Sequence, residues 1–203
     1  MAEGGDAALA TRLYFDRKHK TEAVRILPGE YYATSRDLLL STVLGSCVTA
    51  CIRDKQNGIG GMNHFMLPDG CVDESDPSST PARYGIYAME MLINQITKIG
   101  ARRANLEAKV FGGGNVLPGL AEANVGERNT EFVLRFLKTE SIRIVAHDLV
   151  DIYPRKVYYF PSTGKALVKK LYDLPNNMII TREKDFSSQL SKAGAGGDIE
   201  LFS

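Results

Sequence analysis

A cysteine and a histidine on neighbouring segments are the residues of this chain best suited to covalent chemistry. Cys47 follows a glycine turn, and His64 ends the next glycine-broken apolar segment. A thiolate nucleophile needs an exposed position, a nearby proton acceptor and backbone donors for an oxyanion. Gly45 allows a sharp turn, so the backbone N–H groups around Ser46 and Cys47 are candidate donors. The pattern indicates a thiol nucleophile, Cys47, with His64 as its base.

Both residues also have a structural interpretation. A free cysteine is most often a small buried apolar residue, and Cys47 can be interpreted in this way. Met62 and Phe65 flank His64 and are consistent with a buried structural histidine. Cys51 lies four residues after Cys47, on the same face of an expected strand, and we assign it to the core.

Zinc binding is a third interpretation, because the chain offers four residues of the right types: Cys47, Cys51, His64 and Cys71. Two cysteines four residues apart in a strand are separated by about 13 Å, at about 3.3 Å per residue, which is too far for a shared tetrahedral metal. The spacing therefore disfavours a metal site unless the segment from Cys47 to Cys51 is helical. Three cysteines are also no disulfide framework.

The segments that must position Cys47 and His64 are expected to be strands. An apolar, partly β-branched run at 38–43 ends at Gly45, and extended character continues from Cys47 to Ile52. Asn57-Gly58 then marks a hairpin turn, and the partner strand over 59–67 carries His64. Because antiparallel strands place residues in cross-strand register, this hairpin brings Cys47 and His64 towards each other.

Turn signals and periodicity divide the rest of the chain. We expect further strands at 23–27, 31–34, 106–111, 142–146, 156–160 and 165–168, and helices from Thr80 to Gly100 and from Glu127 to Glu140. A polar loop covers 69–79, and Gly112-Gly113-Gly114 reads as a tight, packed turn because it lacks the lysine of a phosphate-binding loop. This order favours an α/β fold with a single domain, in which helices pack on a mixed β-sheet.

Domain boundaries follow from composition. We expect a flexible leader over 1–22, one domain over 23–185 and a flexible C-terminal tail over 186–203, whose apolar tip suits docking of a short motif. The 203 residues are 44% hydrophobic, enough for one well-buried core. The formal net charge of +1 and the lack of a long basic run argue against nucleic acid.

Membrane insertion and secretion are not indicated. No stretch approaches the run of about 18 to 20 apolar residues that a membrane helix requires. The first residues lack the charged-then-apolar order of a secretory signal. A cytoplasmic location is therefore expected, where the cysteines stay reduced.

Several motifs, in order from about Val24 to about Leu171, resemble the CheD family of chemoreceptor glutamine deamidases. They are Leu44-Gly45-Ser46-Cys47-Val48, Gly61-Met62-Asn63-His64-Phe65-Met66-Leu67-Pro68, Gly112-Gly113-Gly114-Asn115, Gly126-Glu127-Arg128-Asn129 and Phe160-Pro161-Ser162-Thr163-Gly164-Lys165. The resemblance implies an α/β fold akin to the deamidase domain of cytotoxic necrotizing factor. It also implies a Cys/His pair that is similar to papain-like chemistry by convergence.

Carried onto this sequence, the resemblance implies that Cys47 is the nucleophile and His64 the general base. The family's third member is a hydroxyl residue six places before the cysteine, which falls on Ser41. Thr42 is adjacent, and neighbouring strand residues point to opposite faces, so which of the two orients His64 stays open. The sequence departs from the family after Asp148-Leu149, where glycines are often found, so the loop there is expected to differ in shape.

The activity implied is hydrolysis of glutamine side-chain amides in methyl-accepting chemoreceptors. A protein-glutamine glutaminase of this kind forms a cysteine thioester, releases ammonia and leaves glutamate. The same route could hydrolyse glutamyl methyl esters of the receptors, and it needs neither a metal nor an organic cofactor. The alternative is a non-catalytic adaptor that binds receptors or a CheC-type phosphatase.

Overall fold

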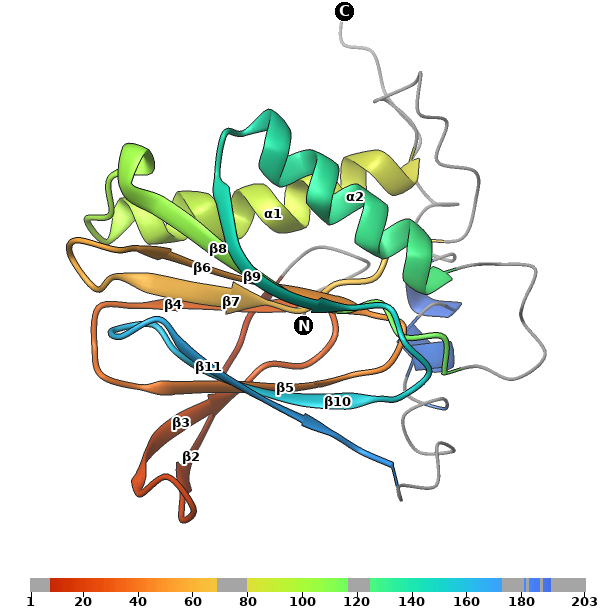
Figure 1. The fold of residues 1–203 in the computed structure, drawn as a ribbon, viewed down its shortest axis with the longest axis horizontal. Coiled ribbons are helices and arrows are strands. Elements are labelled where there is room, and N and C mark those ends of the chain that lie inside the picture. Colours follow the sequence, from red (N-terminus) through yellow and green to blue (C-terminus); the bar gives the residue numbers. More distant parts are fainter. Residues whose placement is uncertain are drawn as a thin grey trace, which may run out of the picture.

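Two β-sheets and one layer of helices build the fold (Figure 1). The structure is a computed structural model that describes residues 8–68, 80–116, 125–172, 181, 183–186 and 188–190. The strands are β1 (Ala8–Leu9), β2 (Arg12–Asp16), β3 (Thr21–Arg25), β4 (Glu30–Thr34), β5 (Leu39–Leu44), β6 (Val48–Asp54), β7 (Gly60–Asn63), β8 (Leu106–Gly112), β9 (Arg143–Leu149), β10 (Arg155–Phe160) and β11 (Lys165–Lys170). The named helices are α1 (Thr80–Lys98), the 3-10 turn η1 (Arg103–Asn105) and α2 (Val125–Thr139), and the described residues 181, 183–186 and 188–190 are also helical.

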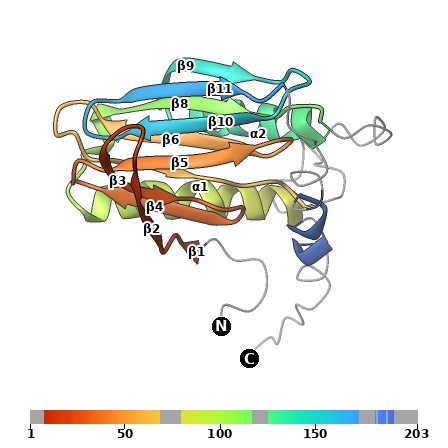
Figure 2. The ribbon, with the colours of Figure 1, turned by 90° about the horizontal axis from the view of Figure 1, so that it is seen from below.

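Both sheets are mixed. The first has the order β1-β4-β7-β6-β8-β9 and the second β11-β10-β5-β3-β2. Helices α1 and α2 cover one face of the first sheet, and the second sheet packs on its other face, as Figure 2 shows from below. The expected α/β class, with mixed strand directions and packed helices, is confirmed. The strands nevertheless divide into two sheets where we expected one, because apolar patterning marks a strand without naming its partners.

Strand β6 is buried on both of its faces. Val48, Ala50 and Ile52 belong to the core cluster between the first sheet and the helices. Cys47 and Cys51 belong to the cluster between the two sheets. This alternation confirms that the two cysteines share a face and that Cys51 is a core residue, and it places Cys47 between the sheets.

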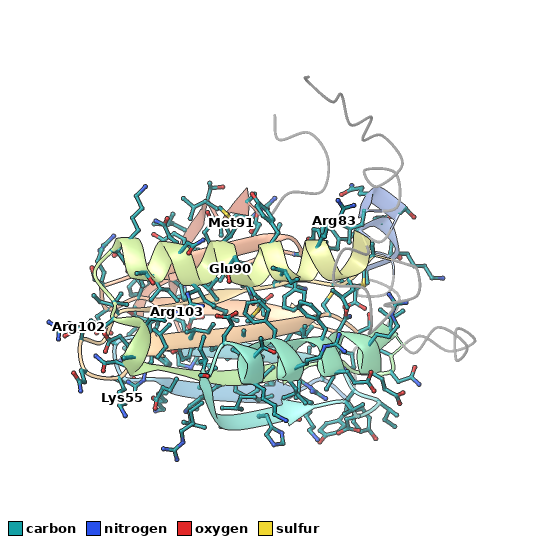
Figure 3. All side chains as sticks on the ribbon, turned by 90° about the horizontal axis from the view of Figure 1, so that it is seen from above. Lys55, Arg83, Glu90, Met91, Arg102 and Arg103 are labelled. Carbon is teal, nitrogen blue, oxygen red and sulfur yellow. The ribbon has the colours of Figure 1, made fainter. Side chains whose placement is uncertain are left out.

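The hairpin that joins β6 to β7 forms at the expected Asn-Gly turn. Gly58 has φ +67°, and its N–H donates to the carbonyl of Asp54 at 3.0 Å. The Asp54 carboxylate accepts hydrogen bonds from the N–H groups of Gln56 and Asn57, which fixes the turn. This turn lies near the end of the molecule where Lys55 and Arg102 are labelled in Figure 3.

The ends of the chain carry more structure than their composition indicates. Residues 8–22, within the expected leader, form β1, β2 and the start of β3. Strand β2 lies at a sheet edge, and its apolar residues Leu13 and Phe15 are 59% and 62% exposed. The usual pattern of a strand, with apolar side chains facing the core, therefore does not mark it in the sequence. The expected polar loop at 69–79 and the apolar tip of the tail lie outside the described residues. Among the helices described, none is long and apolar enough to cross a membrane.

The loop between β9 and β10 holds two residues in a glycine-like conformation. Val150 has φ +62° and Asp151 has φ +79°, at the place where the sequence departs from the family's glycines. The buried guanidinium of Arg155 holds this loop by donating to the carbonyls of Asp148 and Val150. The N–H of Val150 donates to the carbonyl of Gly112 at 2.9 Å. These contacts outweigh the steric cost of a β-branched residue with positive φ.

We predict that Val150→Gly stabilises the protein by about 0.5–1 kcal/mol. Glycine removes a left-handed strain of about 1–2 kcal/mol, and the gain is partly offset by the greater entropy of the unfolded chain. The measurement is the free energy of unfolding in urea. Val168→Gly, at an ordinary strand position of β11, is the control and should be destabilising. A destabilised Val150→Gly variant would contradict the assignment of strain to this loop.

Candidate active site

Cys47 lies on the turn where the chain passes from the second sheet to the first. Its side chain is 0% exposed, and its carbonyl accepts a hydrogen bond from the N–H of Gly113 at 2.8 Å. A Cβ on Gly112, which has φ +116°, would stand 2.2 Å from the same carbonyl oxygen. The glycine triplet is therefore a packed turn, as expected, and it supports the cysteine turn from behind.

Asn129 ties the cysteine turn to the segment that follows His64. It is fully buried on α2, donates from Nδ2 to the carbonyl of Ser46 at 2.9 Å and accepts at Oδ1 from the N–H of Leu67 at 2.8 Å. Asn129 ends the motif Gly126-Glu127-Arg128-Asn129, and the sequence alone indicated no role for it. A polar residue on the apolar face of α2, three residues before Phe132, was the signal for such a role.

His64 is oriented by Thr42. The Nδ1 atom of His64 lies 2.7 Å from Thr42 Oγ1, and that hydroxyl donates its single proton to the carbonyl of Ile26 at 2.7 Å. The Thr42 oxygen can therefore only accept at Nδ1, which must carry the proton. In the neutral ring this network assigns the lone pair to Nε2, the tautomer that a general base needs.

Ser41 points to the opposite face of β5. Its hydroxyl lies 2.8 Å from the hydroxyl of Tyr14, and it stands opposite Tyr158 of β10 in the second sheet. Of the two adjacent hydroxyl residues, the structure therefore brings Thr42 to His64 and leaves Ser41 away from it. The alternation of side chains along a strand is the physical reason.

Strand register places Cys47 and His64 on one face. Cys51 pairs with Met62, and an isolated bridge joins Val48 to Phe65. Continuing this register sets Cys47 and His64 diagonally across the strand pair, on the face that lies between the sheets. Such diagonal neighbours have Cα atoms about 7–8 Å apart, within reach of two side chains.

A carboxylate from the far end of the sequence occupies the cysteine turn. Glu183 is 3% exposed, and Oε1 accepts from the N–H of Gly45 at 3.0 Å and of Cys47 at 3.2 Å. Oε2 accepts from the N–H of Ser46 at 2.9 Å and from its hydroxyl at 2.8 Å. The expected oxyanion donors thus converge on one anion. Nothing in the sequence predicted that Glu183 lies at the cysteine turn.

Burial raises the pKa of the Cys47 thiol well above its ordinary value. The Glu183 carboxylate raises this pKa further, by charge repulsion and by accepting a hydrogen bond from the thiol. Both effects favour the neutral thiol over the thiolate. This arrangement therefore opposes formation of the thiolate, which is the reactive form of a cysteine.

Metal ligation finds no support in the part of the chain that the structure describes. Cys47, which directly precedes β6, and Cys51, which lies within β6, are free thiols, and Cys71 lies outside the described residues. Within the described ranges, no three His, Cys, Asp or Glu side chains cluster in a way that could hold a metal.

Known proteins are similar to this chain over its whole length. A family model described as CheD chemotactic sensory transduction matches residues 66–170. A protein of Janthinobacterium sp. (strain Marseille), named probable chemoreceptor glutamine deamidase CheD, is 61% identical over 203 residues, which is 100% of both chains. A protein of the same name from Herminiimonas arsenicoxydans is 60% identical over 203 residues, again 100% of both. Another, from Dechloromonas aromatica (strain RCB), is 61% identical over 202 residues.

We predict that Asn129→Leu lowers the free energy of unfolding by about 1–3 kcal/mol. The change keeps the branched shape of the side chain but replaces its polar atoms by methyl groups, which leaves a buried carbonyl, Ser46, and a buried N–H, Leu67, without this partner. Urea unfolding measures the effect. Asn105→Leu is the control, because that side chain bonds near the surface. Equal stability of Asn129→Leu and the parent would show that the turn is held without this bridge.

Proposed function

Because the chain belongs to the CheD family, we propose that it is a chemoreceptor glutamine deamidase that works through Cys47. The observation that carries the proposal is the arrangement around that cysteine. Its thiol adjoins a turn whose N–H groups bind an anion, and it shares a face with His64, whose ring is set by Thr42. Nucleophile, base, orienting group and oxyanion donors are thus gathered at one place.

The first half of the reaction forms a thioester. Nε2 of His64 takes the thiol proton, and Sγ of Cys47 attacks the side-chain amide carbon of a receptor glutamine. The amide oxygen becomes an oxyanion, which accepts hydrogen bonds from the N–H groups of Ser46 and Cys47. The imidazolium then protonates the nitrogen, the C–N bond breaks and ammonia leaves.

The second half restores the enzyme. His64 accepts a proton from water, and the resulting hydroxide attacks the thioester carbon. The same donors hold the second oxyanion, the C–S bond breaks, and the thiol is reprotonated while glutamate is released. A glutamyl methyl ester would follow the same course with methanol as the leaving group. Each turnover on glutamine adds one negative charge to the receptor.

The two mixed sheets, with a cysteine and a histidine on facing segments, support kinship with the deamidase domain of cytotoxic necrotizing factor. A thiol nucleophile supports a cytoplasmic location, where cysteines stay reduced. Docking to a CheC-type phosphatase stays a prediction, which is checked by whether a purified partner of that class co-elutes with this protein.

We predict that Cys47→Ala lowers the rate of receptor deamidation by at least about a thousandfold, because it removes the nucleophile. The measurement is mass spectrometry of purified receptor, mapping the conversion of glutamine to glutamate over time. Cys51→Ala removes the core thiol on the same strand and should keep the activity. Undiminished conversion by the Cys47→Ala variant would refute the assignment.

Ser41 and Thr42 form a matched pair for testing which hydroxyl orients the base. We predict that Thr42→Val lowers the deamidation rate by about tenfold to a hundredfold, because the ring of His64 loses its partner at Nδ1. Thr42→Ser keeps the hydroxyl and should restore most of the rate, and Ser41→Ala should leave it near that of the parent. A larger loss with Ser41→Ala than with Thr42→Val would reverse the assignment.

A further inference from the structure

The described residues around Glu183 are helical and amphipathic. Helical conformation is found at 181, 183–186 and 188–190. Glu183, Phe186 and Leu190 point inward, at helical spacing, whereas Lys184 and Asp185 are exposed. Figures 1 and 2 show this helix, in blue, at one end of the two sheets. Figure 3 shows Arg83, at the start of α1, at the same end of the molecule.

The inward face of this helix covers the candidate active site. Phe186 packs against the cluster between the sheets, where its ring atom Cε2 would lie 3.0 Å from a Cβ on Gly29. The N–H of Gly29 donates to the carbonyl of His64 at 2.8 Å. The helix therefore touches the backbone that holds the base as well as the turn that holds the nucleophile.

The fit of the carboxylate to the turn is close. A Cβ on Gly45 would stand 2.7 Å from Glu183 Oε2, so only glycine leaves room for this anion. Besides its contact with the thiol, the carboxylate accepts four hydrogen bonds from the turn, three from backbone N–H groups and one from the Ser46 hydroxyl. A glutamate side chain is also the chemical product of glutamine deamidation. The site thus holds, from its own chain, the group that the proposed reaction leaves behind.

We propose that the helix around Glu183 is a built-in product mimic, which occupies the active site and must be displaced by a receptor helix before glutamine can react. This inference rests on the proposed function for the identity of the substrate. It also describes the substrate: a helix that presents glutamine in the place of Glu183, with apolar residues three and seven positions later. Such a helix would cover the same surface as Phe186 and Leu190.

Occupancy by Glu183 blocks the reaction in two ways. It fills the oxyanion donors, and its charge opposes formation of the thiolate at Cys47. The apparent rate constant is then the intrinsic one multiplied by the fraction of molecules in which the helix has left. Weakening the helix contact raises that fraction without any change to the nucleophile or the base.

Thiol alkylation tests the contact independently of the substrate. The probe is iodoacetamide, and the readout is the rate of modification at Cys47, mapped by peptide mass spectrometry on the full chain. We expect Glu183→Ala to raise this rate several-fold or more, because it removes both the contact that anchors the helix over Cys47 and the charge that opposes the thiolate. Asp185→Ala removes an exposed carboxylate from the same helix and should react like the parent.

Cys51 is an internal control for folding. It is 1% exposed in the core between the sheets and should stay unreactive in every variant. If Glu183→Ala makes Cys51 reactive as well, the variant has unfolded, and Phe186→Ala, which loosens the helix from its other anchor, supplies the test in its place. An unchanged Cys47 rate in a folded Glu183→Ala variant, or in a folded Phe186→Ala variant when that one supplies the test, overturns the proposal.

Deamidation of purified receptor separates this inference from the proposed function. We expect Glu183→Ala to raise kcat/KM for receptor deamidation several-fold. A lower kcat/KM in the folded variant would make Glu183 part of the catalytic machinery and overturn the proposal. If neither parent nor variant converts glutamine while Cys47 alkylation still rises, the proposed function fails and the helix contact stands, as a cover over a reactive thiol.

Discussion

The site depends on one short turn, residues 45–47, whose backbone groups are fixed on both sides. The carbonyls of Gly45 and Cys47 accept from the N–H groups of Gly114 and Gly113, and the carbonyl of Ser46 accepts from Asn129. Because the carbonyls are bonded on one side of the turn, its N–H groups point together to the other side, where they bind the Glu183 carboxylate. A preorganised set of donors of this kind can stabilise negative charge without rearranging during the reaction.

The turn also explains why the protein needs two sheets. Strand β5 belongs to the second sheet and β6 to the first, so the chain changes sheets at residues 45–47. Thr42 comes from β5, whereas His64 follows β7 in the first sheet. Their hydrogen bond therefore spans the gap between the sheets, in a region from which water is excluded. The orientation of the His64 ring is therefore fixed by the packing of one sheet on the other, so it depends on the whole fold.

The sequence predicted the local parts of this arrangement and missed the distant ones. Cys47 and His64 flank one hairpin, and the Asn-Gly turn that sets their register is a strong short-range signal. The choice between Ser41 and Thr42 depended on which face of β5 meets the first sheet, and the sequence of β5 alone does not specify that. The division of the strands into two sheets was not predicted, because apolar patterning does not show which strands pair with each other. Glu183 lies 136 positions from Cys47, and nothing local marks a charged residue on a short helix as buried.

A negative charge on the Cys47 thiolate and one on the Glu183 carboxylate exclude each other at this turn. A thiolate at Cys47 and the charged side chain of Glu183 repel each other at close range in a buried site, where water screens charge poorly. The carboxylate is stabilised there by four hydrogen bonds, whereas the neutral thiol gives up little by staying protonated. The turn can therefore stabilise one negative charge at a time, and whichever group carries it excludes the other. A donor set that binds the oxyanion of the reaction must also bind a carboxylate, so product affinity is inherent in this kind of site.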